Sequence, residues 1–220
     1  MTRLLDLGIE HISKIIMEMV ELSEKSVFTA IDSFEKGLDV KKQIFEWSER
    51  LRQLQEEVAD LAIELIARYQ PVATDLRFIR SCMEIAYGFF RFGRYSYDIV
   101  DVLESMGSVA DCDKSAVLQM ATITREMILL SVKSLQARDR DAVGRLYEMD
   151  DKVDELYRKY LQEAISPRTN EHNEHKQISE PRCFISALLI LRYLERISDH
   201  ACYVGDSVYY IITGTSRPRR

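Results

Sequence analysis

The sequence predicts an all-α protein made of two antiparallel three-helix bundles in tandem, related by pseudo-twofold symmetry. Three observations lead to this prediction. Charged residues make up 30% of the 220 residues, whereas there are only 8 glycines and 4 prolines, and such a composition favours helices. Helix-breaking residues divide the chain into six long segments with short connections, as in antiparallel bundles. The segments of the first half also have counterparts in the second half.

Glycine and proline place the helix ends in the first half of the chain. The first helix is predicted from about residue 3 to a break at Gly37-Leu38-Asp39. The second spans about 40–69 and ends at Gln70-Pro71, because proline disfavours a helical conformation of the residue before it. The third spans about 73–105 and stops at Met106-Gly107-Ser108.

Three further helices are predicted in the second half, over about 112–137, 139–165 and 180–213. The longest polar stretch, 166–180, separates the last two of them. The two bundles therefore cover about 1–107 and 108–214. Residues 215–220 form a short basic tail that we expect to be disordered.

Direct alignment of the two halves supports the repeat. Apolar positions coincide when residues 44–54 are aligned with 146–156, and again when 89–101 are aligned with 194–206. The matching order of helices and breakers makes chance agreement a poor explanation. Identities in the second alignment include Arg91 with Arg196 and Asp101 with Asp206.

Composition also narrows the functional class. The net charge of −6 argues against nucleic-acid binding driven by phosphate neutralisation. Residues 1–15 lack the apolar core and cleavage site of a signal peptide, and no apolar run approaches the roughly 18 residues of a membrane helix. We therefore expect a cytoplasmic protein. The cysteines form no CxxC pair, so they should be reduced and mainly structural; they are Cys82, Cys112, Cys183 and Cys202.

Two predicted helices of the second half each carry acidic residues four positions apart. Asp150 and Asp154 flank the apolar stripe of the fifth helix, and Glu195 and Asp199 share a stripe of the sixth with two arginines and Asp206. One such pair alone is usually a solvated face with weak ion pairs. Two pairs on neighbouring helices repel one another unless a cation lies between them. Oxygen ligands of this kind suit iron, manganese, zinc, magnesium or calcium.

Other sites are weakly indicated. His172 and His175 lie in the polar run TNEHNEHKQ and could contribute to a zinc site, although four ligands are not visible there. The Glu-x-x-His spacing of di-iron carboxylate enzymes does not occur in the chain, so a di-iron enzyme is the less favoured interpretation. GxSxG, HExxH and a glycine-rich phosphate loop are also missing, and we predict no enzymatic activity.

Three segments carry a resemblance to a known family. They resemble the PhoU family of phosphate-uptake regulators in the correct order, and the resemblance covers nearly the whole chain; they are RYQPVATDLRFI (68–79), MDDKVDELYRKY (149–160) and YLERISDHA (193–201). The resemblance implies two three-helix bundles, a cytoplasmic homodimer, and metal clusters bound through DxxxD and ExxxD. It also implies action on a phosphate ABC transporter and on a phosphate-sensing histidine kinase, which restrains phosphate uptake and starvation signalling.

Carried onto this chain, the family's metal ligands fall on Asp150, Asp154, Glu195 and Asp199. The expected cofactor is one or more divalent or trivalent ions, with iron or zinc favoured, bound only in the second bundle. His200 is expected beside this site or unrelated to it rather than as a ligand.

The first bundle departs from the family's pattern. Its equivalent positions are Ser48, Arg52, Phe90 and Arg94. The two arginines would repel a cation, yet they could pair with neighbouring acids or hold an anion. The alternative interpretation is a metal-independent helical scaffold, or an adaptor for another phosphate transporter.

Overall fold

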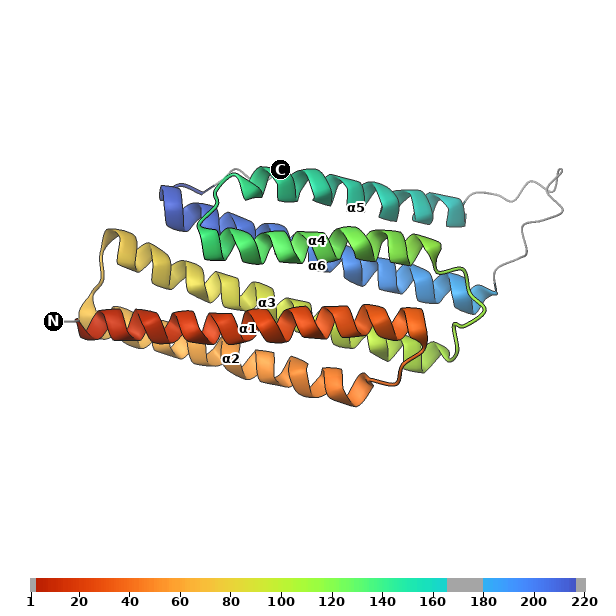
Figure 1. Ribbon diagram of the computed structural model, residues 1–220, viewed down its shortest axis with the longest axis horizontal. Coiled ribbons are helices and arrows are strands. Elements are labelled where there is room, and N and C mark those ends of the chain that lie inside the picture. Colours follow the sequence, from red (N-terminus) through yellow and green to blue (C-terminus); the bar gives the residue numbers. More distant parts are fainter. Residues whose placement is uncertain (1–2, 166–179, 217–220) are drawn as a thin grey trace.

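The computed structural model describes residues 3–165 and 180–216, and within these ranges the chain forms six α-helices and no strands. The predicted all-α class is thus confirmed (Figure 1). Residues 166–179, which include His172 and His175, lie outside the described residues, as do residues 217–220 of the tail. In chain order the helices are α1 (Leu4–Lys36), α2 (Lys41–Tyr69), α3 (Ala73–Met106), α4 (Ser115–Ala137), α5 (Ala142–Ile165) and α6 (Pro181–Thr213).

The helix ends agree with the predicted breakers, except that α4 and α5 each begin about three residues later than expected. An aspartate turn precedes each of these two helices. The Asp113 Oδ1 accepts a hydrogen bond from the Ser115 amide at 2.9 Å, and the Asp139 Oδ1 accepts one from the Asp141 amide at 2.9 Å. Such side-chain bonds to the backbone compete with helix and delay its start.

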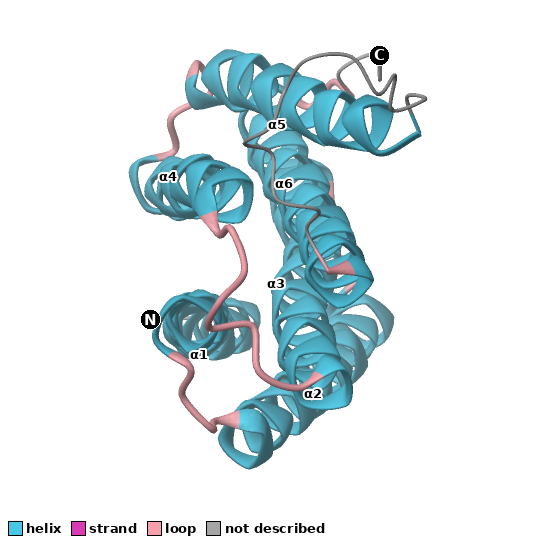
Figure 2. Cartoon of the chain, turned by 90° about the vertical axis from the view of Figure 1, so that its right-hand side faces the viewer, coloured by secondary structure: helices cyan, strands magenta, loops and turns pink. Residues whose placement is uncertain are grey.

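The helices form two layers (Figure 2). One layer contains α5, α6, α3 and α2 in that spatial order, and α1 and α4 cover its inner face. Consequently α1, α2 and α3 pack together, as do α4, α5 and α6, and the long helices α3 and α6 join the two sets. The arrangement matches the predicted tandem of three-helix units.

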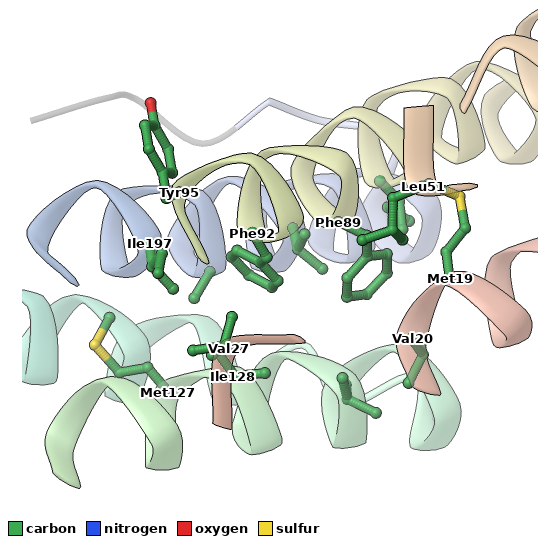
Figure 3. Close-up of a cluster of buried hydrophobic side chains, with 14 of the residues drawn as sticks. Met19, Val20, Val27, Leu51, Phe89, Phe92, Tyr95, Met127, Ile128 and Ile197 are labelled. Carbon is green, nitrogen blue, oxygen red and sulfur yellow. The ribbon is translucent and has the colours of Figure 1, made fainter. Parts of the chain in front are cut away.

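The hydrophobic core lies between the layers and is continuous across both halves. Met19 and Val27 from α1, Phe89 and Phe92 from α3, and Ile128 from α4 meet there (Figure 3). Tyr95 points to the opposite side of α3 from these rings (Figure 3). Because the two halves share this core, the division into units 1–107 and 108–214 stays a prediction, although its boundary falls in the connection between α3 and α4.

Helix α4 contains the one described segment whose length and composition would allow it to cross a membrane, with a mean hydropathy of 1.2. This corrects the expectation that no apolar run comes near that length. In the fold α4 packs against α5, α6 and α1, and 44% of the apolar window is buried.

The structure also corrects the prediction that all four cysteines are reduced. Cys112, in the connection between α3 and α4, forms a disulfide with Cys183 in the first turn of α6. The sequence hides this pairing because 71 residues separate the two cysteines, whereas the fold brings the end of α3 and the start of α6 to one end of the molecule (Figure 1). Cys82 and Cys202 are free, as predicted, and both are buried.

The disulfide closes a loop long enough to restrict the unfolded chain substantially. We expect Cys112→Ser with Cys183→Ser to lower the free energy of unfolding by about 4–4.5 kcal/mol, by the chain-entropy model. Urea unfolding of the wild type with and without dithiothreitol measures this difference. The double variant is the control and should not respond to the reductant; a wild type that ignores the reductant would contradict the prediction.

Candidate metal centre

Helices α5 and α6 pack against each other and bring the predicted carboxylates within electrostatic reach. Repulsion from Asp199 and Asp154 contributes to the raised pKa of Asp150, and Asp154 in turn contributes to the raised pKa values of Glu195 and Asp199. The two acidic pairs, far apart in sequence, therefore form one acidic face between the two helices.

Burial makes this face unfavourable for negative charge. It raises the pKa of Asp150 to about 6, with further repulsion from Asp199 and Asp154 that the nearby Ser198 hydroxyl partly offsets. Burial is also the main cause of the raised pKa values of Glu195 and Asp199. Removing a carboxylate from water disfavours its charged form, so these groups need a compensating positive charge.

Arginines of the same helices supply part of that charge. Arg192 Nη1 lies 2.6 Å from Glu195 Oε1, and Arg196 Nη1 lies 3.0 Å from Asp199 Oδ2. On α5, Arg158 Nη2 lies 3.7 Å from Asp154 Oδ2. Each of these pairs joins residues of a single helix, so none of them links α5 to α6.

Two carboxylate oxygens remain unsatisfied. Asp150 Oδ1 and Glu195 Oε2 are shielded from solvent and accept no hydrogen bond from the described part of the protein. Arg196 Nε lies 3.7 Å from Glu195 Oε2, which is too long for a hydrogen bond. Buried acceptors without partners are unusual and call for an explanation.

The carboxylates of α5 and α6 are chemically suited to bind a metal ion, but their oxygens do not converge on one point. Carboxylate oxygens from two helices, two of them unsatisfied, suit a hard or borderline cation. Within residues 3–165 and 180–216, however, no three Asp, Glu, His or Cys side chains converge closely enough to hold an ion as they stand. A cation would require the arginine-paired carboxylates to turn towards it.

In the first bundle the equivalent arginines pair with acids of their own helices. Arg52 lies 2.7 Å from Glu56 and 3.1 Å from Glu49, and Arg94 lies 2.9 Å from Asp98. Of the two alternatives that the sequence left open for these arginines, pairing with neighbouring acids is the one that the structure displays. Ser48 is buried at its position on α2.

His200 faces α3 rather than the carboxylates. Its ring lies 5.7 Å from Tyr87, 5.9 Å from Tyr95 and 6.0 Å from Tyr203, measured between ring centroids. Burial lowers the pKa of His200 to about 4, with a smaller effect from Arg91 and Arg196. Its placement among aromatic rings agrees with the expectation that it is not a ligand.

The sequence did not single out two neighbours of this face. Ser198 lies close enough to affect the pKa of Asp150, and the Tyr147 hydroxyl donates a hydrogen bond to Asp206 Oδ2 at 2.8 Å. The i, i+3 spacing from Glu195 could have indicated Ser198. The contact between Tyr147 and Asp206 joins two helices and has no local signature.

Comparisons with known proteins agree on one family. The family model described as the PhoU domain matches the chain twice, over residues 16–103 and 117–208. A "Phosphate-specific transport system accessory protein PhoU homolog" from Clostridium acetobutylicum is 26% identical over 97% of both chains. A protein of the same description from Deinococcus radiodurans is 30% identical over 70% of both chains.

Solved structures show the same fold. The phosphate transport system regulatory protein PhoU from Streptococcus pneumoniae superposes with a TM-score of 0.83 at 17% identity, covering 98% of this chain and all of that one. PhoU from Pseudomonas aeruginosa gives a TM-score of 0.75 at 22% identity, covering 96% of this chain and 99% of that one. The two-bundle fold is thereby confirmed.

The acidic face predicts a pH dependence for metal-free protein. Since the folded-state pKa of Asp150 is raised to about 6, the native state binds this proton more tightly than the unfolded state. Its contribution to stability is present at low pH and is lost as the pH rises. We expect the free energy of unfolding to fall by about 1 kcal/mol from about pH 4 to about pH 6.5, because partial solvent access reduces the effect of burial.

Urea unfolding in the presence of a chelator measures this dependence. Asp150→Asn should remove most of the fall and stabilise the protein near pH 7, whereas Glu155→Gln, an exposed change on the same helix, should keep the wild-type profile. If Asp150→Asn leaves the pH dependence of the free energy of unfolding unchanged, folding does not raise the pKa of this carboxyl, and the prediction is wrong.

Proposed function

The chain belongs to the PhoU family, and from that membership we propose that it is a regulator of phosphate uptake and phosphate-starvation signalling. It acts by protein–protein contact on a phosphate transporter, its sensor kinase, or both. The match of both repeats to the PhoU domain carries this proposal. The accessory role named for the curated relatives, which align over nearly the full length of this chain, supports it further. The place of action we propose is the cytoplasm, and the acting form a homodimer.

The proposed regulator binds metal in its second bundle. Asp150, Asp154, Glu195 and Asp199 would hold one or more ions, iron or zinc by resemblance to the family. The support from this chain is the pair of buried, unsatisfied oxygens on Asp150 and Glu195. Positive charge between α5 and α6 would satisfy both oxygens and offset the repulsion among four carboxylates.

One of the arginine pairs is a small obstacle to such binding. The side chains of Arg196 and Asp199 are 43% and 40% exposed, and an ion pair this open to water contributes at most about 1 kcal/mol. An ion that coordinates Asp199 therefore displaces a weak partner, whereas at Glu195, whose side chain is 12% exposed, it would have to replace the charge of Arg192. In the first bundle, by contrast, Arg52 and Arg94 occupy the ligand positions themselves.

A specific observation favours a second candidate function, a metal-independent scaffold. The arginines of α5 and α6 already pair with three of the four carboxylates. If these pairs suffice, the acidic face is a structural or docking surface, and partner binding needs no ion. The two functions differ in one measurable property, the metal content of the purified protein.

Metal content is expected to depend on the second bundle alone. Asp154→Asn with Asp199→Asn should abolish bound iron or zinc, because it removes one ligand from each helix. The matched control in the first bundle, Arg52→Ala with Arg94→Ala, should retain it. Elemental analysis of untagged protein measures the bound metal. Full metal content in the aspartate variant would refute these ligands. A metal-free wild type whose stability does not change on addition of metal would favour the scaffold.

The regulatory role predicts a cellular phenotype. Deletion of the gene should raise phosphate uptake and phosphate-starvation transcription when phosphate is plentiful, since the restraint on both is removed. Uptake of radiolabelled phosphate and a starvation-responsive transcript measure the two effects. Complementation with the wild-type gene is the control. Unchanged uptake and transcription in both rich and poor phosphate would contradict the proposal.

A further inference from the structure

A polar cavity of about 110 Å³ lies between α3 and α6, the helices that join the two repeats. Ser81 and Glu84 line it from α3, and Asp206 and Ser207 line it from α6. Asp206 follows Asp199 by two helical turns, about 10 Å along the helix. The cavity is therefore separate from the acidic face between α5 and α6.

The Ser81 hydroxyl is the group that points to a ligand in this cavity. The residue is only 2% exposed, and its hydroxyl has no hydrogen-bond partner in the described part of the chain. Ser96 and Ser198, two buried serines of these helices, instead donate to a backbone carbonyl at 2.7 Å. A buried hydroxyl that faces a polar cavity without a partner is costly, and a bound ligand or its water would satisfy it.

The charges and donors around the cavity favour a cation. Glu84 and Asp206 supply two carboxylates against one guanidinium, that of Arg80, which stacks over the Tyr210 ring at 5.0 Å. An anion would meet both carboxylates. The oxygen donors at the wall are of the kind that hard divalent ions prefer.

Existing hydrogen bonds orient two of these oxygen atoms for such an ion. The Ser207 hydroxyl donates to the Tyr203 carbonyl at 3.0 Å, so its oxygen can only accept or coordinate. The Tyr147 hydroxyl donates to Asp206 Oδ2 at 2.8 Å. Outer hydrogen bonds of this sort fix a ligating carboxylate and strengthen a metal site.

We propose that this cavity binds a hydrated divalent cation of the Mg²⁺ and Mn²⁺ class, through Glu84 of α3 and Asp206 of α6, with Ser81 bonded to a water of the ion. On the scale of about 10–15 Å³ for one enclosed water, the cavity holds an ion with several waters. The ion bridges one helix of each repeat, so its binding stabilises their contact. This site depends neither on the proposed regulatory function nor on the metal centre between α5 and α6.

Mn²⁺ binding followed by electron paramagnetic resonance tests the proposal. The full-length Asp154→Asn, Asp199→Asn variant serves as the background, because it removes the other candidate centre. One Mn²⁺ should bind per chain, and Mg²⁺ should compete with it. Adding Glu84→Gln should weaken binding at least about tenfold, by loss of a ligand, while Glu57→Gln, an exposed change on α2, should leave the affinity unchanged.

Asp206→Asn, which keeps an oxygen for the Tyr147 hydroxyl, is a second variant in case Glu84→Gln does not fold, and it should also weaken binding. Thermal unfolding adds an independent readout. Mg²⁺ should raise the melting temperature of the background variant and not that of its Glu84→Gln derivative. Equal Mn²⁺ affinity in the Glu84→Gln and Glu57→Gln proteins would overturn the proposal. Stabilisation by inorganic phosphate without Mg²⁺, lost in Arg80→Gln, would overturn it as well, because the site would then bind anions.

Discussion

Gly88 of α3 lies so close to α6 that a Cβ atom there would come within 2.6 Å of Val204 Cγ2. Because Gly88 has no side chain, α3 and α6 pack at short distance, and the rest of the architecture depends on that contact. It joins the third helix of each repeat, merges the two cores into one, and fixes α6 as the common wall of the acidic face and of the cavity lined by Ser81. Arg125 of α4 adds a polar link by pairing with Asp32 of α1.

The two repeats share a fold but carry side chains of opposite charge at two of their equivalent positions. In the second repeat, carboxylates project from α5 and α6 into a half-buried region where ionisation is unfavourable, and arginines of the same helices compensate only in part. In the first repeat, Arg52 and Arg94 stand where carboxylates would, and their acidic partners Glu56 and Asp98 lie one turn away. Both surfaces keep close charge pairing, but among the described carboxylates of the two surfaces only two oxygens, Asp150 Oδ1 and Glu195 Oε2 of the second repeat, are buried without a hydrogen bond. That asymmetry is the physical basis for placing a cation in one repeat and not in the other.

Local sequence signals predicted the parts of this structure that depend on local physics. Breakers such as Gly37 and Pro71 located the helix ends, and helical spacing put Glu195 and Asp199 on one stripe. Features that depend on tertiary contact were missed or only outlined. The Cys112–Cys183 disulfide joins residues 71 positions apart, and the cavity combines Glu84 with Asp206 from different repeats. The later starts of α4 and α5 have a local cause, the turns at Asp113 and Asp139, which the periodicity of apolar residues does not reveal.

We propose that positive charge bound between α5 and α6 completes the second repeat, whereas the first repeat needs none. Anomalous diffraction from crystals of the wild-type protein, collected on both sides of the iron and zinc absorption edges, would locate such a charge. We expect an anomalous peak beside Asp150, Asp154, Glu195 and Asp199, and no peak beside Arg52 and Arg94. A peak in the first repeat, or a metal-loaded crystal with no peak between α5 and α6, would contradict it.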